Sequence, residues 1–221
     1  MYRIILIIVI TLFVIRIIWI YRAGKWDFVL LKNLINQSFE LLIKWLMLSE
    51  FKSNIFKRLR YFFISTTVIF FIILALTGII PVVILGEQIS GLFLIVHVTI
   101  APFFVAALML TAVFWAHFQQ FNHSDFIYLR NLQNKKEVRN SGINQQKFWP
   151  KNYFWLFLVF SVPAVLSIIL SMFPYFGTGG QITMLNIHRY STLVLLIIAL
   201  FYTDIKLYLF HKKVKEEQVE E

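Results

Sequence analysis

Residues 61–86 decide the fold class, because they read YFFISTTVIFFIILALTGIIPVVILG and contain no charged side chain. Two further stretches, residues 88–124 and residues 152–188, also lack Asp, Glu, Lys and Arg. A helix that crosses the hydrocarbon core of a bilayer needs about 20 predominantly apolar residues. Each stretch is long enough, so the sequence predicts an all-α, polytopic membrane protein.

The composition agrees with this class. Hydrophobic residues make up 59% of the 221 residues and charged residues 14%, whereas soluble domains have about 45–50% and about 25%. These values exclude a soluble enzyme, a secreted domain and a nucleic-acid-binding protein. The net charge of +10 is expected to lie mainly in cytoplasmic loops, where membrane proteins collect Lys and Arg. The lack of Cys excludes disulfides, Cys-ligated iron–sulfur clusters and c-type haem attachment.

Five membrane spans are expected, at residues 4–21, 61–85, 89–117, 153–173 and 187–208. The first contains Arg16, which can snorkel to the interface, and no Ala-x-Ala-like cleavage site precedes Arg22. Residues 1–22 are therefore predicted to be a retained transmembrane anchor and not a cleaved signal. Pro102 is expected to kink the third span.

The segments between the spans differ in character. Residues 23–60 carry apolar side chains at roughly helical spacing with Lys and Glu between them, which indicates amphipathic helices at the cytoplasmic membrane surface. They serve either as an interfacial linker or as a specific docking surface. Gly142 and Pro150 are expected to interrupt the polar residues 118–152, and three glycines indicate a loop over residues 175–186. Residues 211–221 are expected to be a charged tail after a membrane domain at 61–210.

The distribution of Lys and Arg predicts the orientation. Residues 22–60 hold eight, residues 118–152 hold six and residues 203–221 hold four, whereas residues 86–90 and 175–187 hold none. The three basic segments are therefore expected in the cytoplasm. Five spans then place the N-terminus outside and the C-terminus inside, in a bacterial inner (cytoplasmic) membrane.

Two of the five histidines, His97 and His188, lie inside predicted spans. Ionisable residues at membrane depth are costly and are candidates for function. Both spans run inward from the non-cytoplasmic side, so the two histidines are expected at compatible depths. Two imidazoles that face each other in a helix bundle are the ligand set of a low-spin b-type haem. The alternative is two unrelated histidines that bond to backbone or water.

Arg189 follows His188 directly and is the only Lys or Arg between Lys151 and Lys206. It is expected either to bind haem propionates or to snorkel to the interface.

The other histidines are weaker candidates. His117 and His211 lie 20 and 23 residues beyond His97 and His188, which is roughly 30 Å along a helix, so no second haem is expected there. His123 is expected in a solvated loop.

Three short motifs carry a resemblance to a known family. They are Arg60-Tyr61 through Leu76-Thr77-Gly78, then Gly91 and Leu94-Ile95-Val96-His97, then Asn186-Ile187-His188-Arg189-Tyr190. Together they resemble the membrane cytochrome b subunits of formate dehydrogenase, nickel–iron hydrogenase and thiosulfate reductase. The resemblance covers about residues 57–210. It implies a four-helix bundle that usually holds two b-type haems and passes electrons between a partner subunit and quinone. In this family His97 and His188 match the ligands of the outer haem.

The departures from the family concern the inner haem. Its two ligands would lie near Phe62 and at Tyr202, and neither position is His. Because both ligands of one haem are missing and both of the other remain, we expect a one-haem relative. The aromatic side chains Phe62, Phe63, Phe201 and Tyr202 are expected to fill the space of the missing haem.

The expected function is that of an electron-transfer subunit with one haem b, within a complex that includes an iron–sulfur or cytochrome c-type carrier. Glu87, Gln88 and Gln181 are the polar candidates for a quinone site. No P-loop or dinucleotide motif is present, so no catalytic centre beyond a quinone site is expected. The alternative is a haem-free membrane scaffold or assembly subunit. A transporter is less well supported, because no internal repeat is found.

Overall fold

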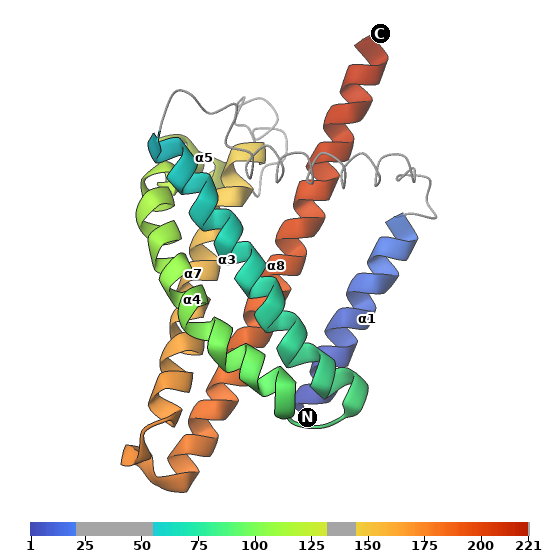
Figure 1. Cartoon of the computed structure of the whole chain (residues 1–221). Coiled ribbons are helices and arrows are strands. Elements are labelled where there is room, and N and C mark those ends of the chain that lie inside the picture. Colours follow the sequence, from blue (N-terminus) through green and yellow to red (C-terminus); the bar gives the residue numbers. More distant parts are fainter. Residues whose placement is uncertain (21–54, 132–144, 221) are drawn as a thin grey trace. The chain divides into compact units, whose positions relative to one another are not determined.

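The computed structural model describes residues 1–20, 55–131 and 145–220, and within these ranges the backbone is helical and contains no strand (Figure 1). Five helices are long and apolar enough to cross a membrane: α1 (Tyr2–Ile20), α3 (Ile55–Ile80), α4 (Gly91–Ala116), α7 (Gln145–Ser171) and α8 (Gly177–Glu220). A shorter helix, α5 (His123–Asn131), precedes α7. The all-α prediction and the prediction of five apolar spans are confirmed.

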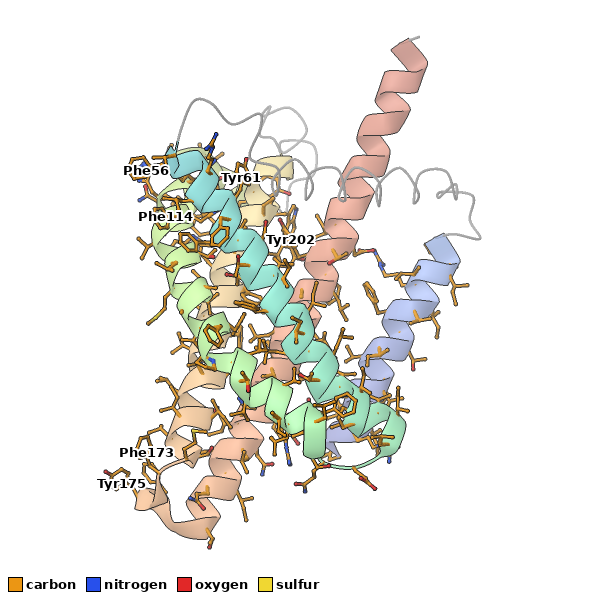
Figure 2. All side chains as sticks on the ribbon, viewed as in Figure 1. Phe56, Tyr61, Phe114, Phe173, Tyr175 and Tyr202 are labelled. Atoms are coloured by element: carbon orange, nitrogen blue, oxygen red, sulfur yellow. The ribbon has the colours of Figure 1, made fainter. Side chains whose placement is uncertain are left out.

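The chain divides into two compact units, which we describe separately: Met1–Phe114 with Lys206–Glu221, and Trp115–Ile205. In the first unit α3 and α4 form an antiparallel hairpin (Figure 1). Aromatic rings pack between the two helices. The ring of Phe63 stacks on that of Phe114, which is labelled in Figure 2, with centroids 5.3 Å apart, and the rings of Phe71 and Phe104 are 6.2 Å apart.

The turn between α3 and α4 contacts the beginning of α1. The second span continues past Ile80 as a π-helical turn, η2 (Pro81–Leu85), which ends at Gly86 with φ +76°. Nη2 of Arg3 donates a hydrogen bond to the carbonyl of Val83 at 3.4 Å. The beginning of α1 therefore lies at the same end of the unit as this turn.

In the second unit α7 and the first part of α8 form another hairpin, connected through the 3₁₀ turn η4 (Pro174–Phe176). The ring of Tyr202, labelled in Figure 2, makes an edge contact with that of Tyr153 at 5.9 Å. Helix α5 packs on the beginning of α7, where Tyr128 is only 2% exposed and its ring lies 4.9 Å from that of Phe148.

The predicted loop at residues 175–186 is wrong, because α8 already begins at Gly177. The glycines at 179 and 180 lie inside its first turns. A Cβ at Gly180 would overlap the Cβ of Phe176, so this glycine allows the chain to pass close to η4. Glycine inside a helix costs about 1 kcal/mol relative to Ala, which a helix of 44 residues tolerates.

Two smaller expectations also differ. Pro150 does not interrupt the polar segment but lies inside α7, close enough to the helix start that few backbone hydrogen bonds are lost. His123 is the first residue of α5 and not part of a loop, although it is exposed. The tail continues α8 as far as Glu220. The amphipathic prediction falls largely on residues 21–54 and the predicted break at Gly142 falls on residues 132–144, which lie outside the described ranges; residues 55–60 begin α3.

Candidate functional site

His97 lies on α4, six residues after the helix begins at Gly91, or about 9 Å along its axis. Its half-buried ring faces α3, where Nδ1 is 2.9 Å from the hydroxyl oxygen of Thr77. The next residue on α3, Gly78, leaves the ring room: a Cβ there would be 3.7 Å from Cε1 of His97. The hairpin therefore fixes one ring nitrogen of His97.

His188 lies on α8, eleven residues after Gly177, or about 16 Å along the axis. Because α8 begins at Gly177 and not near residue 187, His188 lies inside the helix and not at its end. Its half-buried ring faces α7, and Nδ1 is 2.8 Å from the carbonyl oxygen of Ala164. A carbonyl only accepts hydrogen bonds. Nδ1 of His188 therefore donates its proton to Ala164, and Nε2 carries the lone pair of the neutral ring.

Both histidines lie in the first half of an apolar span of 29 residues, Gly91–Gln119 for His97 and Gly177–Ile205 for His188. They belong to different compact units, so their pairing around one iron stays a prediction. Within the described residues no three His, Asp or Glu side chains come together as a metal site. A haem held by two axial histidines does not need such a group.

The remaining candidates are Arg189 and two other histidines, His117 and His211. Arg189 is half-buried beside His188, and its role toward a propionate stays a prediction. His117 is exposed in the 3₁₀ turn η3 (His117–Gln119), and its ring makes an edge contact with Phe118 at 5.6 Å. The side chain of His211 lies outside the described part of the structure.

The polar residues expected at a quinone site are distributed over two elements. Glu87 and Gln88 are exposed in the turn between η2 and α4, whereas Gln181 is half-buried in the second turn of α8. Their assignment to quinone stays a prediction.

The aromatic residues expected in place of the inner haem pack within their own hairpins. Phe62 makes an edge contact with Phe63 at 5.3 Å, and Phe63 in turn stacks on Phe114. Tyr202 contacts Tyr153. Phe201 is 55% exposed, so the prediction that it fills space between helices has no support within its unit.

Sequence reasoning missed the partners of the two histidines. Thr77 belongs to the Leu76-Thr77-Gly78 motif of the family resemblance, which is a signal for its importance but not for its role. The carbonyl of Ala164 has no signal in the sequence, because every residue type supplies the same backbone acceptor.

Comparisons of the chain with protein-family models, with curated proteins and with solved structures found no match. The class defined by the described residues is an all-helical protein with five helices able to cross a membrane. The exposed apolar side chains on these helices indicate a lipid bilayer as their surroundings.

Proposed function

We propose that this chain is a membrane electron-transfer subunit that binds one b-type haem, with His97 and His188 as the axial ligands. The observation that carries the proposal is shared by the two rings: each has Nδ1 engaged by the neighbouring helix of its own hairpin. Histidines that bind metals commonly donate the other ring N–H to an acceptor, which fixes the tautomer and the ring orientation. The residues therefore fit an axial role through Nε2.

The chain itself would supply the ligands, the orientation of the rings and an apolar surrounding, and the haem would supply one-electron redox chemistry. Arg189 is the proposed cation for a propionate, since Arg binds carboxylates in a bidentate manner. Electrons would pass between a partner redox subunit, of the iron–sulfur or cytochrome c type, and quinone or another haem. The proposed setting is a bacterial inner membrane with the N-terminus outside.

The test is a reduced-minus-oxidised absorption spectrum of the purified chain, followed by haem titration of single variants. The wild type is expected to show b-type bands, and His97→Ala and His188→Ala are each expected to lose the low-spin spectrum. His117→Ala is the matched control and should keep it, because that ring is exposed in η3. Circular dichroism checks that each variant remains helical.

Two results would overturn the proposal. Retention of the native spectrum in either of the first two variants would exclude the His97–His188 pair. A wild-type chain that takes up no haem would leave the alternative function, a haem-free scaffold or assembly subunit.

A further inference from the structure

We propose that Thr77 is a positioning residue, which holds His97 in the tautomer that has its proton on Nδ1 and its lone pair on Nε2. The hydrogen-bond assignment stands on the α3–α4 hairpin alone. Its consequence for iron rests on the proposed function.

The first step is the direction of the bond between the two side chains. A threonine hydroxyl has one proton and two acceptor lone pairs. The Thr77 hydroxyl oxygen lies 2.8 Å from the carbonyl oxygen of Ile73, one turn earlier on α3, and 3.1 Å from that of Leu74. Both carbonyls only accept hydrogen bonds, so the proton of Thr77 is given to its own helix, as is common for Thr inside helices.

The second step concerns the imidazole. With its only proton directed to α3, Thr77 presents a lone pair to Nδ1 of His97 at 2.9 Å. Nδ1 must then be the protonated nitrogen, since two lone pairs would otherwise face each other. The result is a directional chain from Nδ1–H of His97 through the hydroxyl of Thr77 to the carbonyl of Ile73.

The third step is the setting of this chain. Thr77 is 9% exposed and lies in the apolar span Arg58–Leu85, where little water is present to compensate a lost hydrogen bond. The two histidines differ in the kind of group that contacts Nδ1, so a substitution at Thr77 can test the tautomer of one of them. His188 donates to a backbone carbonyl, which no substitution removes, whereas Nδ1 of His97 bonds to a side-chain hydroxyl, that of Thr77, which a substitution can remove. Loss of the Thr77 hydroxyl should therefore release the tautomer of His97 alone.

The experiment measures the tautomer directly, in full-length protein labelled with ¹⁵N-histidine and prepared without haem in lipid nanodiscs. Ring ¹⁵N chemical shifts distinguish Nδ1–H from Nε2–H, and the His97 signals are assigned by their loss in His97→Gln. The wild type is expected to show Nδ1–H at both His97 and His188. Thr77→Val keeps the shape of the side chain without its hydroxyl and should shift His97, but not His188, toward Nε2–H.

Two variants separate positioning from packing. Thr77→Ser restores a hydroxyl and should restore the wild-type signals of His97. Thr66→Val removes a hydroxyl that also donates to its own helix, to the carbonyl of Phe62 at 2.9 Å. Thr66 lies eleven residues before Thr77 on α3, about 16 Å along the axis, so this variant should leave His97 unchanged. A wild-type His97 with its proton on Nε2, or a Thr77→Val protein that keeps Nδ1–H, would overturn the proposal.

Haem titration of the same samples tests the consequence for the proposed function. Loss of such a partner typically weakens metal binding by about 10–100-fold, so Thr77→Val should bind haem more weakly by a factor in this range and Thr77→Ser as the wild type does. If the tautomer responds as expected but no sample binds haem, the positioning role stands and the proposed haem function fails. If haem binds and the tautomer does not respond, the function stands and the role of Thr77 fails.

Discussion

The hydroxyl oxygens of Thr67 and Thr111 lie 2.8 Å apart between α3 and α4, and the two residues are 5% and 4% exposed. Thr67 also donates to the carbonyl of Phe63 on its own helix at 2.8 Å, so Thr111 is the donor between the helices. The same pattern occurs at Thr77 and His97. In both pairs a threonine gives its proton to α3 and accepts a bond from α4.

This relationship predicts the effect of Thr111→Val on the stability of the hairpin. The variant keeps the packing but removes the donor, and hydrogen bonds between membrane helices contribute about 0.6–2 kcal/mol. We expect a loss in this range in the free energy of unfolding, measured in lipid bilayers by steric trapping. The double variant with Thr67→Val should lose less than the sum of the two single variants, because they share one interaction. Strict additivity would contradict the assignment.

A second prediction concerns the contact between α5 and α7. Oδ2 of Asp125 accepts hydrogen bonds from Nζ of Lys151 and from the backbone N–H of Asn122, each at 2.7 Å. Burial raises the pKa of Asp125, but the hydrogen bonds and the charge of Lys151 outweigh it and hold the pKa below its usual value of 3.8. A carboxyl whose pKa is lowered in the folded state stabilises the contact at pH values above its usual pKa. This contribution is lost as the pH falls through the pKa of the folded state.

Amide hydrogen exchange of α5 measures this dependence. Protection should be constant at neutral pH, after correction for intrinsic exchange rates, and should fall only below about pH 3.8. Lys151→Met leaves the carboxylate without its cation and should weaken the contact by about 1–3 kcal/mol. Arg130→Gln, on the exposed side of α5, is the control and should change little. Equal protection in Lys151→Met and wild type would show that the ion pair does not hold α5.

The sequence predicted the apolar helices better than the ends of those helices. Runs with few or no charged residues follow directly from the cost of charge in lipid, which is why five spans were found. The start of α8 was missed because glycines at 179 and 180 usually indicate a loop, whereas Gly180 is needed for close approach to Phe176. That requirement arises from the fold of the α7–α8 connection and has no local pattern.

The candidate site was predictable to a similar extent. His97 and His188 were identified by their type and their position in apolar spans, but the groups that hold their rings were not. The bond from His188 to Ala164 depends on the register of α7 against α8, and the bond to Thr77 depends on that of α3 against α4. Helix register is a consequence of packing, which periodicity along a single helix does not specify.

A third prediction concerns Gly86, where the chain turns from η2 toward α4. Its φ of +76° is unfavourable for residues with a side chain, and a Cβ would lie 2.7 Å from Nη1 of Arg3. Gly86→Ala should lower the free energy of unfolding by about 1–2 kcal/mol, mostly from the backbone, because the end of the Arg3 side chain can move. The cost should therefore persist in an Arg3→Ala background. Gly179→Ala is the matched control, since it lies in α8 with open space around it, and should be neutral or stabilising.

A fourth prediction concerns orientation. The basic segments at 22–60, 118–152 and 203–221 are expected in the cytoplasm. A reporter inserted after residue 135 should therefore be active in the cytoplasm, and one inserted between Glu87 and Gln88 should be active outside. The second site lies in the turn between η2 and α4, because residues 175–186 are helical from Gly177 and offer no loop for an insertion. The opposite pattern of activity would reverse the orientation and move the proposed haem to the cytoplasmic side.

The last prediction is the number of haems bound by one chain. A porphyrin between helices needs an opening, and an unfilled opening loses its dispersion contacts. In the α3–α4 hairpin Phe63 stacks on Phe114, next to Phe62, where the family resemblance would place an inner ligand. In the α7–α8 hairpin Tyr202 packs on Tyr153. A pyridine haemochrome assay should therefore give about one haem per chain, the number set by one pair of axial histidines. The double variant His117→Ala, His211→Ala should give the same value. A ratio near two in the wild type that falls to one in this variant would identify His117 and His211 as ligands of a second haem, and would show that the aromatic side chains do not replace it.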